Sequence, residues 1–415
     1  MRGTMAAKLM PVVLLVAWPA LGQEDAALAH ARALLKTAPL VDGHNDLPWE
    51  IRDDPKAKGD VALYDLRQHT PGETDLDRLH QGQLSAQFWS VWIPAEMKTG
   101  FARVQLEQID LARRMIERYP EAFTFATRAA DIPRAKREGK LASFLGMENG
   151  QALENSLGAL RAYYDLGVRY MTLTHWRTSD WADAATDKPL HDGLTPFGKE
   201  VVREMNRLGM LVDISHVSPK TMSDVLDVSE APVIFSHSSA LAICDHPRNV
   251  PDPILERLAR NGGVVMVTFI PAFVSQAARD WGRGLDDATG AVTGTADLRR
   301  IHDEYEAAHG PEPKATLAQV ADHIEHVAKV AGIDHVGIGS DFAGVAMPVG
   351  LEDVTRYPYL LAELIRRGWK DEDLRKLAGE NLVRAFTQAE AAAARLQATR
   401  GPSHATIEAL DGPAK

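Results

Sequence analysis

The sequence has almost no cysteine: Cys244 is the single thiol in 415 residues. An intramolecular disulfide is therefore excluded, and the fold must be held together by packing and hydrogen bonds. Because disulfide pairs are what report an oxidising compartment, the cysteine content does not indicate where the protein works.

The sequence also lacks an excess of basic residues. Its 46 Lys and Arg are outnumbered by 57 Asp and Glu, which gives a formal net charge of −11 at pH 7. A surface with this charge repels phosphate backbones and anionic lipid headgroups. Nucleic acids and anionic membranes are therefore not expected as partners.

A long apolar segment is missing as well. The apolar run over residues 10–18 is too short to span a bilayer as a helix. The basic residues Arg2 and Lys8 precede this run, and the small residues Ala20 and Gly22 follow it. This pattern is typical of a secretory signal peptide cut before Gln23, with an ordinary buried helix as the alternative. We expect residues 1–22 to be the signal peptide, the mature protein to be secreted or periplasmic, and no stable membrane anchor to remain.

What the sequence does contain is an alternation of short apolar runs with amphipathic segments. Hydrophobic residues make up 45% of the chain, enough for a large core. Eight runs are rich in Val, Ile, Leu or Phe, as strands buried on both faces should be. They cover residues 39–47, 87–94, 141–149, 170–176, 211–217, 233–238, 262–270 and 335–342. This order predicts an α/β fold, a (β/α)8 TIM barrel of the metal-dependent hydrolase type, with a doubly wound open sheet as the alternative.

The segments between the runs carry helix signals. Thr195-Pro196 supplies an N-cap and a first-turn proline, and Gly209 stands where that helix should end. We expect one barrel domain over residues 23–390 and a flexible tail over 391–415. The long, charged segment 271–313 follows the seventh run, so it would lie over the barrel mouth as a lid, or else form a solvated excursion without a role.

Ionisable side chains stand at the carboxyl end of six of these eight runs. They are His44 and Asp46, Glu148, His175, His216, His237 and Asp341. In a parallel barrel these ends all open on one mouth. A lone buried histidine is more often a hydrogen-bonded core residue, but this many buried polar groups are costly without a common partner. A metal would explain them together, because imidazoles and carboxylates suit zinc and one carboxylate can bridge two ions.

These residues resemble the membrane (renal) dipeptidase family, peptidase family M19, of the amidohydrolase superfamily. His44-Asn-Asp46 stands where most amidohydrolases carry His-x-His. Other strings similar to that family are Thr174-His175, Asp180-Trp-Ala-Asp183, Asp213-Ile-Ser-His216, Ser236-His-Ser-Ser239 and Pro247-Arg-Asn249. The resemblance runs from about residue 39 to about residue 385, nearly the whole mature chain.

The resemblance implies a dipeptidase with two Zn²⁺ per chain, bridged by Glu148 and a hydroxide. The implied ligands are His44 and Asp46 for one ion and His216 and His237 for the second. Asp341 would act as general base and then general acid, and His175 would polarise the scissile carbonyl and contact the substrate. Arg248 would grip the C-terminal carboxylate of a free dipeptide, where its planar fork matches two oxygens. A D-residue would be tolerated at that C-terminal position.

Three functions stay open at this point. The first is dipeptide hydrolysis. The second is metal-dependent hydrolysis of another small amide or lactone, such as a β-lactam or an N-acyl amino acid, since one fold hosts many reactions. The third is a non-catalytic binding protein. Manganese or cobalt could replace zinc with this ligand set, and a homodimer is compatible with the resemblance.

The remaining polar residues have structural interpretations. Asp42 and Asp213 would orient neighbouring groups, and His246 and His323 are read as surface or loop histidines. Cys244 is expected to be a small buried residue. The segment Thr268-Phe-Ile270 stands where some relatives place a tyrosine near the substrate carboxylate, so the resemblance does not imply the side-chain preference of the pocket.

Overall fold

The computed structural model describes residues 25–290, 295–343 and 345–412. The expected signal peptide, residues 1–22, lies outside the described residues, so export stays a prediction. None of the described helices combines the length and the apolar character that a bilayer crossing requires.

Eight parallel strands close into a barrel. They are β1 (Val41–Asn45), β2 (Ala86–Trp92), β4 (Leu141–Glu148), β5 (Val168–Thr172), β6 (Leu211–Asp213), β7 (Ile234–Phe235), β8 (Val264–Val267) and β9 (Val336–Ile338). Successive members of this series pair in parallel, β9 pairs with β1, and β2 pairs directly with β4, which completes the ring. The predicted TIM barrel is confirmed, and an open doubly wound sheet is excluded because the ring is closed.

A further strand, β3 (Phe123–Phe125), was not expected from the sequence. It pairs with the first residues of β4, on the same edge that β5 joins further along. Three residues are too few for an apolar run to stand out between two helices. Each of the eight predicted runs overlaps a barrel strand, although β2 and β5 begin before their runs. Most strands also end before their runs do, so most of the ionisable side chains lie in the turns just beyond the strand ends.

Helices surround the barrel in chain order. Those of the outer ring are α4 (Phe101–Arg118), α6 (Leu157–Asp165), α7 (Pro196–Leu208), α8 (Pro219–Val228), α9 (Asp252–Asn261), α13 (Leu317–Ala331) and α14 (Tyr357–Arg366). Shorter elements are α1 (Ala26–Leu35), α2 (Leu47–Asp53), α3 (Leu76–Gln81), α5 (Asp131–Arg137), α15 (Asp371–Arg375), η1 (Gly150–Leu153), η2 (Ile333–His335), η3 (Val354–Arg356) and η4 (Lys376–Glu380). The predicted ends of α7 are confirmed: the Thr195 side chain accepts the N–H of Gly198, and Gly209 has φ 82°.

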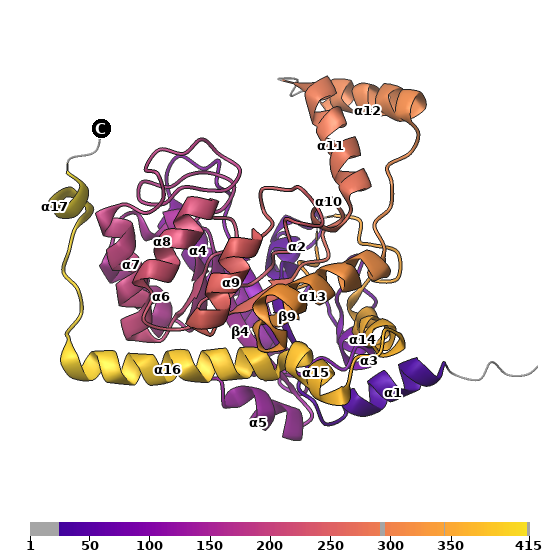
Figure 1. Cartoon of the computed structure of the whole chain (residues 1–415), viewed down its shortest axis with the longest axis horizontal. Coiled ribbons are helices and arrows are strands. Elements are labelled where there is room, and N and C mark those ends of the chain that lie inside the picture. The colour runs from indigo at the N-terminus through magenta and orange to yellow at the C-terminus, as the bar shows by residue number, and fades with distance from the viewer. Residues whose placement is uncertain (1–24, 291–294, 344, 413–415) are drawn as a thin grey trace, which may run out of the picture.

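The long helix α16 (Asn381–Thr399) closes the end of the barrel opposite the strand carboxyl ends. Phe386 lies 5.8 Å from Phe144 and 6.4 Å from Phe88, ring centre to ring centre, within the apolar cluster inside the barrel. The helix runs past the expected domain limit at residue 390, and Leu396 is still buried. It is followed by α17 (Ile407–Asp411), where Asp411 accepts the N–H of Phe197 (Figure 1). The packed chain therefore extends further than the sequence indicated.

The segment after β8 is largely helical. It contains α10 (Pro271–Val274), α11 (Gln276–Thr289) and α12 (Thr295–His309). The first two of these helices contribute to the wall of the cavity at the barrel mouth. Helix α12 lies farther out, beyond α11 (Figure 1), and has no buried residue among those described. The expectation of a segment over the mouth therefore applies to its first half.

Candidate metal centre

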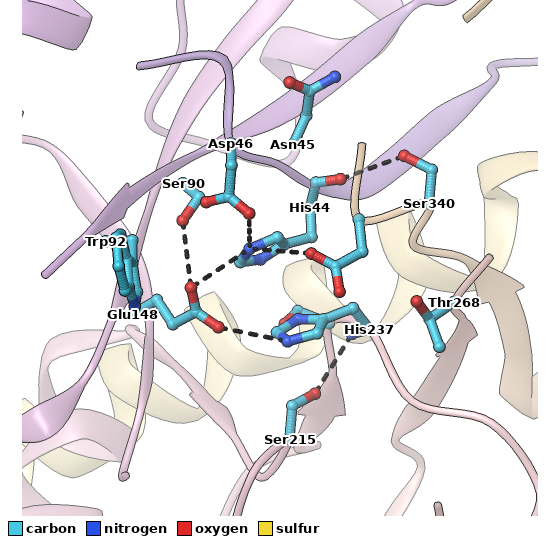
Figure 2. A network of polar contacts seen from close by, with 12 residues as sticks. His44, Asn45, Asp46, Ser90, Trp92, Glu148, Ser215, His237, Thr268 and Ser340 are labelled. Carbon is cyan, nitrogen blue, oxygen red and sulfur yellow. Dashed lines mark hydrogen bonds and ion pairs between the residues drawn. The ribbon is translucent and has the colours of Figure 1, made fainter. Parts of the chain in front are cut away.

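The strand ends bring the predicted ionisable residues to one place at the barrel mouth. His44 is the last but one residue of β1, Glu148 is the last residue of β4, and His216 and His237 follow β6 and β7 within three residues. All four side chains are at most 5% exposed. Figure 2 shows His44, Asp46, Glu148 and His237 converging on a common space. Burying this group of ionisable side chains costs free energy unless they share a partner.

Glu148 lies between two sets of potential ligands. Its Oε2 atom is 3.5 Å from Nε2 of His44, whereas its Oε1 atom is 2.9 Å from Nε2 of His216 and 3.3 Å from Nε2 of His237. Each carboxylate oxygen therefore faces a different set of imidazoles. This is the arrangement that a carboxylate bridging two ions would have.

The first set contains His44, Asp46 and Glu148. Nε2 of His44 lies 3.4 Å from Oδ2 of Asp46 and 3.8 Å from Oδ1 of Asp341. Among the described residues, Nε2 of His44 and Oδ1 of Asp46 are buried without a hydrogen-bond partner. Such orphaned atoms are rare in native proteins and call for a bound water or ion.

The second set contains His216, His237 and Glu148. The two Nε2 atoms lie 3.0 Å apart, and both face the same oxygen of Glu148. Ligand atoms around a tetrahedral zinc ion lie roughly 3.3 Å apart, given zinc–ligand distances of about 2.0–2.1 Å. The atom spacings of both sets fit a metal ion of this size. In the described chain, three overlapping groups of three His, Asp or Glu residues have their ligand atoms within 4.8 Å of one another.

The protonation states also fit. Burial lowers the pKa of His216 and His237 well below the usual value, so both rings are neutral. Burial raises the pKa of Glu148, but electrostatic interactions with His44 and His175 and the hydrogen bonds from His216 and His237 outweigh it and hold this pKa well below its usual value. Burial lowers the pKa of His44, but the neighbouring Tyr170, Glu148 and Asp46 raise it well above its usual value, so a metal ion would take the place of a proton on this ring. The neutral rings of His216 and His237 beside an ionised carboxylate are suited to a divalent cation.

Two hydroxyl groups hold ligand rings in place from behind. The Tyr170 hydroxyl lies 2.8 Å from Nδ1 of His44 and donates to the carbonyl of Gly43 at 3.1 Å, so Nδ1 of His44 is the donor in that pair. In the neutral ring, which a metal ligand requires, Nε2 of His44 is then left with its lone pair. Ser236 Oγ lies 2.7 Å from Nδ1 of His237 and holds that ring from the same side. Partners of this kind fix the orientation of metal-ligating histidines.

A glycine on β4 makes room for this tyrosine. A Cβ atom at Gly146 would lie 2.1 Å from the Tyr170 ring, closer than real atoms approach. Gly146 pairs with Tyr170 across β4 and β5. Sequence analysis missed Tyr170, whose only signal was an apolar strand position.

Asp341 faces the first set from the end of β9. Burial raises the pKa of Asp341 to about 7, with the charges of Asp46 and Glu148 adding to the effect and that of His44 opposing it. Its backbone has φ 65°, and that of His216 has φ 68°. Left-handed backbone at non-glycine residues is strained and clusters at functional sites.

His175 and Arg248 complete the site. Nε2 of His175 lies 3.9 Å from Oε1 of Glu148, and burial lowers the pKa of His175 to about 4. Arg248 is 1% exposed, and its guanidinium donates to Ser238 Oγ at 3.3 Å and to the carbonyl of His237 at 3.2 Å. It forms no ion pair within the described chain, and its Nε has no partner there. A buried cation in this state calls for an anionic ligand.

Except for His44, which is 0% exposed, the ionisable residues of the site line one cavity of about 830 Å³. Its wall also includes the aromatic rings of Trp49, Trp92 and Trp176, and Arg279 from α11. The structure thus brings together every residue that the sequence placed in the site. His323 is completely buried on α13, so its interpretation as a surface or loop histidine was wrong. His246 does lie in a loop, but it is 8% exposed and forms part of the cavity wall. The structural interpretation of Asp42 and Asp213 agrees with their hydrogen bonds to backbone N–H groups of Ser340 and of Ser215 and Ser236.

Comparisons with known proteins give the same picture. The model of the family described as membrane dipeptidase (Peptidase family M19) matches residues 28–400. The structure of the probable dipeptidase PvdM from Pseudomonas aeruginosa is 28% identical with a TM-score of 0.76, over 88% of this chain and 99% of that one. The dipeptidase AC, a metallopeptidase of family M19, is 25% identical with a TM-score of 0.69, over 85% and 99%. A metallopeptidase from Rhodobacter sphaeroides, liganded with a phosphinate mimic of the dipeptide L-Ala-D-Ala, shares the fold at 24% identity and a TM-score of 0.69, over 85% and 99%.

Proposed function

The chain belongs to the membrane dipeptidase family, peptidase family M19, and on this premise we propose that it is a two-zinc enzyme that hydrolyses free dipeptides. The activity class, a metal-dependent dipeptidase, follows from the family. The number and identity of the ions, the residue roles and the substrate range are the content of the proposal.

One observation carries the proposal: the two oxygens of Glu148 face two different sets of ligand atoms. His44 and Asp46 would hold one ion together with Oε2, and His216 and His237 would hold the second together with Oε1. A carboxylate serving a single ion would not need imidazoles on both sides. Zinc suits this mixture of nitrogen and oxygen donors.

Two divalent ions held in this way would lower the pKa of a shared water, so that a nucleophile is available near neutral pH. Asp341 faces this space without belonging to either ligand set, and its raised pKa allows it to hold a proton near pH 7. We assign it the transfer of the water proton to the leaving amine. A group that takes up and releases a proton works best when its pKa is close to the working pH.

His175 and Arg248 would position the substrate. The neutral His175 ring can donate a hydrogen bond to the scissile carbonyl, where negative charge develops in the transition state. The unpaired guanidinium of Arg248 would bind the substrate carboxylate. The cavity of about 830 Å³ lies in the upper part of the usual range for small-molecule sites, roughly 300–1,000 Å³, so it has room for a dipeptide. Tolerance of a D-residue at the C-terminal position is part of the proposal.

Residues 1–22 support an extracytoplasmic location as part of the same proposal. A basic start, a short apolar run and small residues before Gln23 are typical of exported proteins. The substrates would then be free dipeptides outside the cytoplasm.

The deciding experiment measures metal content per chain and hydrolysis of L-alanyl-D-alanine for the wild type and for Glu148→Gln. We expect about two zinc ions and activity in the wild type, with both reduced in the variant, because the amide cannot bridge two cations. Glu121→Gln is the matched control, since Glu121 is 53% exposed and pairs with Arg67 on the surface.

Two other outcomes would overturn the proposal in different ways. Two zinc ions without dipeptide hydrolysis would favour the hydrolysis of another small amide or lactone, to be identified with a panel of β-lactams and N-acyl amino acids. Protein prepared without chelator that contains no metal would favour a binding protein.

A further inference from the structure

His246 is buried in the cavity wall, outside both sets of metal-ligand residues. It is 8% exposed and lies in the loop between β7 and α9, two residues before Arg248. Its ring lies 4.2 Å from that of Phe273 on α10, and the Arg248 guanidinium lies 5.4 Å from the same ring. His246 and Arg248 therefore both lie beside the Phe273 ring, at the same end of the cavity.

The hydrogen bonds of His246 determine which nitrogen carries the proton. The backbone N–H of Arg248 donates to Nδ1 of His246 at 3.1 Å. Because a backbone N–H can only donate, Nδ1 is the acceptor, and in the neutral ring Nε2 carries the hydrogen. In the described parts of the chain the hydrogen bond of this ring is the one at Nδ1, and His246 lines the cavity. Its Nε2–H is therefore available to donate to a molecule bound there.

The loop that carries His246 is braced on both sides. The side chain of Asn249 donates to the carbonyls of Cys244 and Phe273, both at 2.8 Å, and accepts from the N–H of Ser239 at 3.2 Å. The N–H of His246 itself bonds to the carbonyl of Cys244 at 2.8 Å. The Nε2–H of the ring is thus held in a fixed position rather than on a mobile loop.

The surroundings favour an anion at this end of the cavity. Burial, and then the positive charges of Arg279 and Arg248, lower the pKa of His246 to about 3, so the ring is a neutral donor across the physiological range. Neither arginine forms an ion pair within the described residues, and no metal-ligand group found there includes His246. A carboxylate has two oxygens with about four lone-pair sites, enough to accept from a guanidinium and an imidazole at once.

We propose that His246 is a substrate-binding residue whose Nε2–H donates to the carboxylate that Arg248 binds. This inference rests on the proposed dipeptidase function and adds a second donor to the substrate subsite. The carboxylate would be held by two groups on a rigid loop, which limits where the scissile bond can lie relative to Glu148. Fixing a substrate between several anchors is how a site keeps the reacting atoms in position.

Two substitutions separate this role from a structural one. His246→Asn keeps an acceptor at the position of Nδ1 for the Arg248 N–H but removes the donor at Nε2. His246→Gln places its amide nitrogen near the position of Nε2 and so keeps the donor. We expect His246→Asn to raise KM for L-alanyl-D-alanine about tenfold with kcat within about twofold of wild type, since a hydrogen bond to a charged group is among the stronger kinds. His246→Gln should restore KM to within about threefold.

Equal kinetics of His246→Asn and wild type would overturn the inference. Equal losses in both variants, shared between kcat and KM, would instead show a structural role. A second readout does not depend on turnover: nitrogen NMR of histidine-labelled protein, with D-alanine added as the probe. We expect the His246 Nε2–H resonance to shift with D-alanine in the wild type, and a resonance that does not respond would also overturn the inference. A wild type that fails to hydrolyse dipeptides but shows this shift would contradict the proposed function alone.

Discussion

Nε1 of Trp92 lies 3.3 Å from Nδ1 of His175, and the direction of this hydrogen bond is fixed because an indole N–H can only donate. Nδ1 of His175 is therefore the acceptor, and the hydrogen of the neutral ring is on Nε2. That atom faces Glu148 and the cavity. The last residue of β2 thus determines that His175 presents a donor to the substrate.

The first prediction concerns this pair. Trp92→Phe removes the N–H and keeps an aromatic ring in the cavity wall. We expect kcat for L-alanyl-D-alanine to fall roughly five- to tenfold, because one neutral hydrogen bond contributes about 1 kcal/mol, and metal content to stay unchanged. Trp49→Phe is the control, since Trp49 also lines the cavity and packs edge-on against Trp92 at 4.3 Å. The same kcat in both variants would contradict the assignment.

The second prediction concerns the hydroxyl groups behind the ligand rings. Tyr170→Phe removes the partner of Nδ1 of His44, so the first ion should bind about 10- to 100-fold more weakly, the usual effect of losing such a partner. Ser236→Ala removes the partner of Nδ1 of His237 and should weaken the second ion by a similar factor. Competition with a chelator of known affinity measures both. If each variant loosens the two ions equally, the assignment of one hydroxyl to one site is wrong.

The part of this site that the sequence could predict is the part that strand ends determine. His44, Glu148, His216 and His237 end apolar runs, and parallel strands in a barrel must bring their carboxyl ends together. Tyr170 could not be found in this way. The period of the apolar residues predicts which face of a strand a side chain lies on. The contact between Tyr170 and His44 depends instead on the space that Gly146 leaves on β4.

The loops were less predictable than the strands for a related reason. His246 and His323 belong to no periodic pattern of apolar residues, and their burial depends on how α10 and α13 pack on the loop after β7. The same limit explains the C-terminal helix. The run of alanines after residue 390 shows no clear pattern of large apolar residues. Small side chains nevertheless allow α16 to pack closely, with Ala392 and Ala393 buried.

The third prediction separates proton transfer from metal binding. Asp341→Asn removes the carboxylate that faces the first set but leaves all five proposed ligands in place. We expect about two zinc ions per chain to remain and kcat to fall by about 10²- to 10⁴-fold, the usual range for a general acid–base group. Metal analysis and steady-state kinetics on the same preparation give both values. A loss of one ion in this variant would make Asp341 a ligand rather than a proton carrier.

The fourth prediction concerns pH and rests on His323. Its Nδ1 accepts the N–H of Ala240 at 3.0 Å, and its Nε2 donates to the carbonyl of Val274 at 3.2 Å, so the buried ring bridges α13, α10 and the loop after β7 as a neutral group. Burial lowers the pKa of His323 from 6.5 to about 4. Between these values the unfolded chain binds a proton that the folded chain does not, so the contribution is fully present above about pH 6.5 and is lost as the pH falls towards 4. We expect the free energy of unfolding of the metal-free protein to decrease over this window by roughly 3 kcal/mol more in the wild type than in His323→Gln, which has no titrating group at position 323.

Urea unfolding at pH 7.5, 5.5 and about 4 measures the difference. The metal-free protein is needed because metal release by the other histidines depends on pH as well. His323→Gln will start from a lower stability, since it weakens two hydrogen bonds, so the decisive quantity is the slope with pH rather than the value at any one pH. Parallel slopes for the two proteins would mean that His323 is protonated as readily in the fold as in the unfolded chain.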